Sequence, residues 1–202
     1  HNVDFNKVNL ADYGKHENYM GRQIHRWTKQ YKDSETQMIP EINELIEWLP
    51  KNIPSDQETS IVHGDFRLDN MIFDPITHEV KAILDWELST LGNPIADFTY
   101  HMMSWRLPAG AKGLGMMGSD LKSLNIPSES EYAELYYKKT GREKIDNWDF
   151  YMAYNIFRLA GIAQGIVGRV RDGTASSSEA KNYEAFVPIL GKLGWSIVEG
   201  IK

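Results

Sequence analysis

The chain has 202 residues, a net charge of −6 at pH 7 and no cysteine. Its hydrophobic content of 42% is that of an ordinary globular protein, which excludes a disordered tail or a fibre. The acidic balance argues against a nucleic-acid partner, because binding to phosphate backbones requires clustered Lys and Arg, and the lack of cysteine excludes disulfides and thiolate chemistry.

Two helices are predicted ahead of residue 51. Apolar side chains recur every three or four positions over residues 15–32, which is the spacing of an amphipathic helix. A second stripe of this kind covers residues 40–49, where Pro40 suits a first helical turn and Pro50 stops the helix.

The periodicity changes between residues 59 and 85, where short β-type runs are separated by turn residues such as Asp74-Pro75. These runs cover residues 60–62, 71–73 and 80–84. They predict a small β-patch between helices.

The remainder of the chain is predicted to be helical. The helices are expected over residues 94–105, 130–140, 147–170 and 177–198. The glycine-rich segment 107–125 interrupts them, and we expect it to be a mobile loop or to line a site. We interpret the whole chain as one compact unit.

The strongest chemical feature is the segment His63-Gly64-Asp65-Phe66-Arg67-Leu68-Asp69-Asn70, which lies between two of the β-type runs. Phosphoryl transfer requires a carboxylate that orients the acceptor hydroxyl and hard oxygen ligands for Mg²⁺. Asp65 and Asn70 are spaced as these two groups are spaced in kinases. Asp85 ends the apolar run 80–84 and is the candidate for a second metal ligand.

These residues resemble the aminoglycoside phosphotransferase and choline kinase family, in which His-Gly-Asp, four residues and Asn are followed by an Ile-Asp or Leu-Asp strand. The run from Leu84 to Pro94, Leu-Asp-Trp-Glu-Leu-Ser-Thr-Leu-Gly-Asn-Pro, is similar to the phosphotransferase-like domain fused ahead of acyl-CoA dehydrogenases and to its free-standing bacterial relatives. The resemblance extends over nearly all of the chain.

The resemblance implies an α+β, protein-kinase-like fold, with residues 1–202 as its mainly helical C-terminal, catalytic lobe. It implies Asp65 as the catalytic carboxylate, and Asn70 and Asp85 as ligands of Mg²⁺ on the phosphates of ATP. Arg67 would stabilise charge on the transferring phosphate.

Two further residues are expected to support the loop. His63 would be structural, and Asp97 matches a family carboxylate that braces the catalytic loop from the following helix. An acidic residue is also favourable at a helix N-terminus on electrostatic grounds.

A complete enzyme of this type also needs a glycine-rich loop over the phosphates and a strand Lys paired with a helix Glu, all upstream of the catalytic loop. Only 62 residues precede His63, and they are predicted to be helices and linkers. We therefore expect the N-terminal nucleotide lobe to be absent from this chain, and the fragment to be inactive alone.

The expected function is Mg²⁺- and ATP-dependent phosphorylation of a hydroxyl on a small molecule. The resemblance suggests a hydroxylated acyl group or its coenzyme A thioester as acceptor, and a fused or associated acyl-CoA dehydrogenase as partner. The alternative is a non-catalytic, pseudokinase-like docking module in lipid metabolism.

The expected location is the soluble interior of the cell. No apolar run reaches the roughly 18 residues that span a bilayer. A mitochondrial or peroxisomal location is implied by the resemblance alone.

Overall fold

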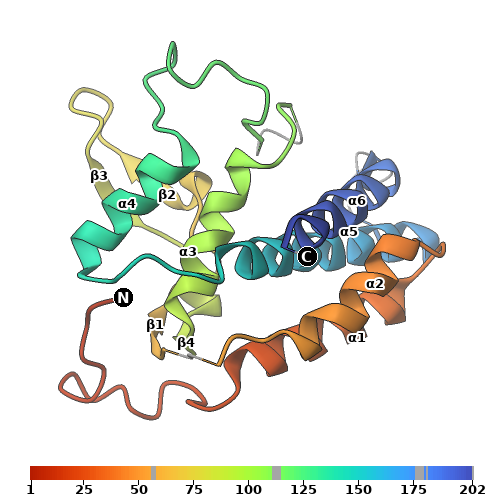
Figure 1. Cartoon of the computed structure of the whole chain (residues 1–202), viewed down its shortest axis with the longest axis horizontal. Helices are drawn as coiled ribbons and strands as arrows, with labels where there is room; N and C mark the ends of the chain where they lie inside the picture. Colours follow the sequence, from red (N-terminus) through yellow and green to blue (C-terminus); the bar gives the residue numbers. More distant parts are fainter. Residues whose placement is uncertain (56–57, 111–114, 176–179, 181, 202) are drawn as a thin grey trace. The chain divides into compact units, whose positions relative to one another are not determined.

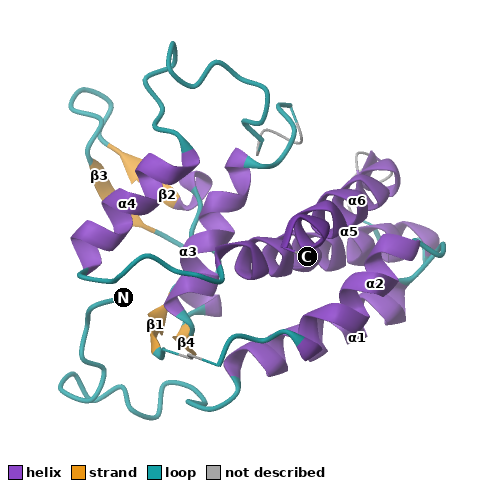
Figure 2. Cartoon of the chain, viewed as in Figure 1, coloured by secondary structure: helices purple, strands orange, loops and turns teal. Residues whose placement is uncertain are grey.

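The computed structural model describes residues 1–55, 58–110, 115–175, 180 and 182–201. The described chain is mixed α+β, with six α-helices and four short strands among these residues (Figures 1 and 2). It divides into two compact units, each built from two stretches of sequence. The first unit contains His1–Glu17 and Glu58–Asp146, and the second contains Asn18–Gln57 and Asn147–Lys202.

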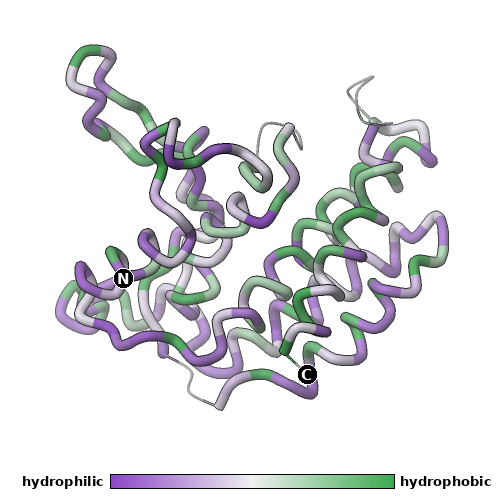
Figure 3. The backbone as a smooth tube through the Cα atoms, turned by 45° about the horizontal axis from the view of Figure 1, so that its top comes forward, coloured by the Kyte–Doolittle hydropathy of each residue, from purple (hydrophilic) through white to green (hydrophobic). Residues whose placement is uncertain are grey.

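The second unit is helical. Its helices are α1 (Tyr19–Ser34), α2 (Pro40–Trp48), α5 (Trp148–Arg171) and α6 (Tyr183–Ile201). They correspond to the four predicted helices of these segments, with ends that differ by a few residues. The predicted start of the last helix, near residue 177, lies outside the described residues. Hydrophobic and hydrophilic positions alternate along the helices, as amphipathic packing requires (Figure 3).

Four of the five apolar residues of the predicted stripe of α1 are buried, and the fifth, Tyr19, is half-buried at the start of the helix. Met20, Ile24, Trp27 and Tyr31 are all at most 7% exposed. The helix packs closely on α5, where a Cβ added at Gly168 would lie 2.8 Å from the Cβ of Ser34. Glycine is therefore required at this position for the two helices to approach so closely.

The first unit contains the β-patch as two separate antiparallel pairs. β1 (Ser60–Val62) pairs with β4 (Thr90–Gly92), and β2 (Met71–Phe73) pairs with β3 (Val80–Ile83). The three predicted runs are confirmed as strands. β4 was not predicted, because its extended conformation comes from its pairing with β1, which is distant in the sequence.

Two helices complete the first unit, α3 (Pro94–Met102) and α4 (Glu129–Thr140). The side chain of Asn93 caps α3 by accepting hydrogen bonds from the backbone N–H groups of Ile95 and Ala96, both at 2.9 Å. This cap and Pro94 start the helix so that Asp97 lies in its first turn. The predicted helix 94–105 ends as an α-helix at Met102, and a 3-10 turn continues it to Trp105.

Part of the glycine-rich segment 107–125 lies outside the described residues, which omit 111–114. In its described part, Pro108 and Met117 form an isolated parallel bridge. Its mobility stays a prediction. No helix in the described ranges is long and apolar enough to cross a membrane.

Candidate active site

The segment His63–Asn70 forms a loop that leaves the end of β1 and enters β2. The buried ring of His63 fixes its start. Its Nε2 lies 2.9 Å from the carbonyl oxygen of Leu84, and its Nδ1 accepts a hydrogen bond from the backbone N–H of Asp65 at 3.2 Å. Nε2 therefore carries the proton that it donates to Leu84. These contacts tie the ring of His63 to the loop and to the end of β3, and its purely structural role stays a prediction.

Gly64 gives the loop its sharp turn. Its φ is +86°, in the left-handed region that side chains disfavour, and an added Cβ would lie 2.6 Å from the carbonyl oxygen of Leu88. Glycine satisfies both conditions, so the next residue, Asp65, can project from a fixed turn.

Asp97 holds the backbone of this turn from the first turn of α3. Its Oδ2 accepts a hydrogen bond from the His63 N–H at 2.9 Å, and its Oδ1 accepts one from the Gly64 N–H at 2.8 Å. The residue is 5% exposed, so both bonds lie in a low-dielectric environment where they are strong. Asp97 thus holds the turn from α3, and its role as the brace of a catalytic loop stays a prediction.

Asp65 and Asn70 are in direct contact. The Asn70 side-chain nitrogen donates to the Asp65 carboxylate oxygen Oδ2 at 3.1 Å and to the Asp65 carbonyl oxygen at 2.8 Å. Because the nitrogen faces Asp65, the amide oxygen of Asn70 is directed away from the carboxylate. The Asp65 carboxylate and the Asn70 amide oxygen are thus held as separate groups on one loop.

Asp85 is brought beside this loop by the pairing of β2 and β3. The backbone N–H of Leu84 donates to the carbonyl oxygen of Asn70 at 2.8 Å, and Asp85 follows directly. Asp85 adopts a left-handed conformation, with φ 65° and ψ 51°, which turns the chain out of the strand. Within the described residues no group donates to its exposed carboxylate.

Arg67 lies between two acidic residues. Its Nε is 3.8 Å from Oδ1 of Asp65, and its guanidinium also contacts Asp69. Burial lowers the pKa of Arg67, but the neighbouring Tyr100, Asp65 and Asp69 outweigh it, and the net effect is a raised pKa. The side chain is a permanent cation beside the carboxylate of Asp65.

The donor set fits Mg²⁺ bound together with phosphates. Mg²⁺ takes hard oxygen ligands and is commonly held by one or two carboxylates while substrate phosphates supply further ligands. Asn70 offers an amide oxygen, and Asp85 offers a carboxylate to which no group in the described part of the chain donates. Among the described residues no group of three or more His, Cys, Asp or Glu side chains could form a metal site alone.

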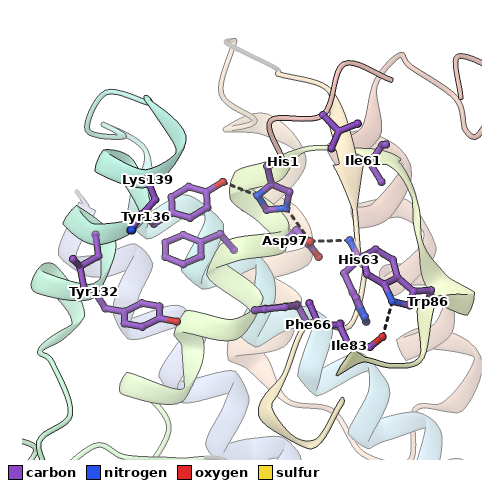
Figure 4. Close-up of a pocket in the computed structure, with 13 residues that line it drawn as sticks. His1, Ile61, His63, Phe66, Ile83, Trp86, Asp97, Tyr132, Tyr136 and Lys139 are labelled. Carbon is purple, nitrogen blue, oxygen red and sulfur yellow. Dashed lines mark hydrogen bonds and ion pairs between the residues drawn. The ribbon is translucent and has the colours of Figure 1, made fainter. Parts of the chain in front are cut away.

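A mostly apolar cavity of about 510 Å³ lies beside the loop, where His63 and Phe66 line it (Figure 4). Asp65, Asn70 and Asp85 are absent from the described residues that line it. Its wall is formed by His1, Val3, Ile61, His63, Phe66, Ile83, Trp86, Asp97, Phe98, Tyr132, Leu135, Tyr136 and Lys139. The cavity therefore borders the loop at His63 and Phe66, on the side that faces Asp97.

Sequence reasoning missed two residues of this site, His1 and Tyr136. The His1 ring lies 3.1 Å from Asp97 through Nε2 and 2.7 Å from the Tyr136 hydroxyl through Nδ1 (Figure 4). These contacts join residues 96 and 135 positions apart. No local pattern around a lone histidine indicates them.

An α+β chain with a helical majority, a small antiparallel β-patch and an Asp65–Asn70 loop between two of its strands has the kinase-like phosphotransferase fold. The chain belongs to the phosphotransferase enzyme family, whose model matches residues 1–135. It is similar to the crystal structure of a protein assigned as an aminoglycoside phosphotransferase from Ralstonia eutropha. The TM-score is 0.93 at 49% identity, covering 98% of this chain and 61% of that one.

Curated relatives carry a different name. The chain is 45% identical to mouse acyl-CoA dehydrogenase family member 10 and 38% identical to human acyl-CoA dehydrogenase family member 11, over 96% of its own length in each case. It spans 18% and 25% of those two proteins. The resemblance to phosphotransferase-like domains of acyl-CoA dehydrogenase family proteins is confirmed.

Proposed function

We propose that the protein transfers a phosphoryl group from ATP to a hydroxyl of a small molecule, with Asp65 as the catalytic carboxylate. The observation that carries the proposal is the contact between Asp65 and Asn70, which fixes one carboxylate and leaves one amide oxygen for a metal ion. In the reaction the acceptor oxygen forms a bond to the γ-phosphorus, the bond to the β,γ-bridging oxygen breaks, and ADP leaves. The acceptor proton passes to Asp65.

Asn70 and Asp85 would hold Mg²⁺ on the nucleotide phosphates, where the ion neutralises the charge that develops during transfer. Arg67 would contribute a second positive charge near the transferring group. Its raised pKa supports a constant charge at working pH. Asp69 pairs with Arg67 on the exposed side of the loop and would orient the guanidinium.

A nucleotide-binding lobe would complete this site in the full-length protein. The support is an exposed apolar surface on and beside the β2–β3 hairpin, since such surfaces usually mark an interaction site. The exposed large apolar residues of this segment are Leu68, Ile72, Phe73, Ile76, Val80, Leu84, Trp86 and Leu88. The structural relative from Ralstonia eutropha is also longer than this chain.

The acceptor we propose is a hydroxylated acyl group or its coenzyme A thioester. This choice is supported by the names of the curated relatives, which are acyl-CoA dehydrogenase family members. A fold hosts many chemistries, so the choice does not rest on the fold.

The second candidate is a non-catalytic docking module that holds an acyl-CoA dehydrogenase-like partner. The same exposed apolar surface of residues 68–88 favours it, because a docking surface would use these side chains. The two candidates differ in whether Asp65 is needed.

The test uses the full-length protein with radiolabelled ATP, Mg²⁺ and a panel of hydroxyacyl and hydroxyacyl-CoA acceptors. Asp65→Asn should reduce transfer by roughly 10² to 10⁴-fold. Asp12→Asn, an equivalent change at an exposed site of the same unit, should not. Normal transfer by Asp65→Asn would refute the assigned role, and no transfer by the wild type to any acceptor would favour the docking module.

A further inference from the structure

His1 connects the catalytic loop to a helix that is distant in the sequence. Its Nε2 lies 3.1 Å from Oδ2 of Asp97, and its Nδ1 lies 2.7 Å from the hydroxyl oxygen of Tyr136 on α4. The dashed lines in Figure 4 follow this path from Tyr136 through His1 and Asp97 to His63. We infer that His1 is a positioning residue, which sets the catalytic loop by holding the carboxylate of Asp97.

In either protonation state of the His1 ring, Nε2–H donates to Oδ2 of Asp97. In the neutral ring Nδ1 then accepts from the Tyr136 hydroxyl, and in the imidazolium Nδ1–H donates to that hydroxyl oxygen. Burial raises the pKa of Tyr136, which keeps its hydroxyl protonated and able to donate. The hydrogen bond from His1 to Asp97 is therefore present in both states of the ring.

The position of Tyr136 is itself fixed by packing. Its ring stacks on Phe98, with centroids 3.8 Å apart and an interplanar angle of 10°. Phe98 follows Asp97 directly on α3, so one helix supplies both the stacking partner and the carboxylate. The hydroxyl of Tyr136 and the acceptor on Asp97 are therefore held at opposite sides of the His1 ring.

The hydrogen bond from His1 to Asp97 lies in a buried environment. The side chains of His1 and Asp97 are 16% and 4% exposed, and both line the apolar cavity beside the loop. A buried carboxylate needs hydrogen-bond donors, because water cannot replace them there. The donors to Asp97 include the N–H groups of His63 and Gly64 and the ring of His1. Without His1, Oδ2 of Asp97 would lose the donor that lies opposite the loop, and the two hydrogen bonds to the turn would be held less rigidly.

The loss of His1 is expected to displace the carboxylate of Asp65. Asp65 follows Gly64, so a shift of the turn moves the catalytic carboxylate, and small misplacements of reacting groups are costly to rate. The inference rests on the proposed function only in treating this loop as catalytic. Its experiment is chosen so that the two can fail separately.

The test measures amide hydrogen exchange by NMR at His63 and Gly64. In His1→Leu, which fills the space without a donor, exchange at both amides should become about tenfold faster, because one hydrogen bond to a charged group is lost. In His1→Gln, whose amide nitrogen can reach the same oxygen, exchange should return to near the wild-type rate. His25→Leu, at an exposed position of α1, is the matched control and should leave both amides unchanged.

Tyr136→Phe keeps the stacked ring and removes only the hydroxyl, so it tests the path if His1→Leu does not fold. It should accelerate exchange at both amides by about threefold, whereas Tyr13→Phe, at an exposed position, should not. Unchanged exchange in both His1→Leu and Tyr136→Phe would overturn the inference. Failure of His1→Gln to restore slow exchange would overturn it as well, because the shape of the ring rather than its donor would then be responsible.

A second readout applies in the full-length enzyme. His1→Leu should lower kcat by about tenfold with little change in KM for ATP, and His1→Gln should restore most of it. If the wild type transfers no phosphoryl group, the proposed function fails, and the exchange result still decides the role of His1.

Discussion

Asn70 holds Asp65 through two hydrogen bonds from one amide nitrogen, at 3.1 Å to the carboxylate and 2.8 Å to the carbonyl oxygen. The two residues are five positions apart, and the loop between them closes on itself through this contact. One side chain thereby orients a carboxylate and directs an amide oxygen elsewhere. The proposed chemistry depends on this division of roles.

Replacement of Asn70 by Ala tests both roles of this side chain, the orientation of Asp65 and the proposed binding of Mg²⁺. The variant loses both hydrogen bonds to Asp65 and the proposed oxygen ligand, so phosphoryl transfer should fall by about 10²-fold or more. Raising the Mg²⁺ concentration should recover part of this loss. Steady-state kinetics over a range of Mg²⁺ concentrations measures it, with Asn6→Ala at an exposed site as the control. Kinetics indistinguishable from the wild type would remove Asn70 from the site.

Asp97→Asn should destabilise the protein by about 3 kcal/mol. The amide presents only one acceptor oxygen, so the N–H of His63 or of Gly64 loses its partner in a buried site. Urea unfolding monitored by circular dichroism measures the free energy of unfolding. The same substitution at exposed Asp12 should change it by less than about 0.5 kcal/mol. Equal effects of the two substitutions would contradict the bracing role of Asp97.

Gly64→Ala tests the turn, and Gly118→Ala provides its matched control. Both glycines have positive φ, +86° and +88°, but only Gly64 has a neighbour that an added Cβ would strike. Gly118→Ala should cost about 1 kcal/mol from backbone strain alone, and Gly64→Ala about 3 kcal/mol because the Leu88 carbonyl must also move. Thermal unfolding compares them. A cost for Gly64→Ala no larger than that for Gly118→Ala would show that the Leu88 contact is not limiting.

His101 should make the stability of the protein depend on pH. Burial lowers its pKa from the ordinary value of 6.5, among the rings of Phe66, Trp105 and Tyr132. Below pH 6.5 the unfolded chain therefore binds more protons than the folded chain, so stability falls as the pH falls from 6.5 toward the lowered pKa.

The variant His101→Phe removes this titration. Its stability curve should run parallel to that of the wild type above pH 6.5 and lie progressively higher relative to it as the pH falls below that value. Urea unfolding at a series of pH values between about 5 and 8 checks this. Curves that stay parallel over the whole range would show that His101 does not titrate differently in the folded and unfolded states.

The features that the sequence predicts are those encoded locally. The helical stripe of α1 and the loop from His63 to Asn70 depend on residues a few positions apart, and both are found as predicted. β4 and the contacts of His1 were not predictable in this way. Thr90 is extended because it pairs with Val62, and His1 meets its partners only after the first unit has folded. The left-handed backbone of Asp85 likewise follows from the turn that ends β3.

The most direct test of the proposed function is calorimetric titration of the full-length protein with ATP in the presence and absence of Mg²⁺. The wild type should bind ATP more tightly with Mg²⁺, and Asp85→Ala should lose that Mg²⁺-dependent increase, while Asp12→Ala should keep it. An Asp85→Ala variant that binds Mg²⁺ and ATP as well as the wild type would contradict the assignment of Asp85 as a metal ligand. No binding of ATP by the wild type would contradict the phosphotransferase proposal itself.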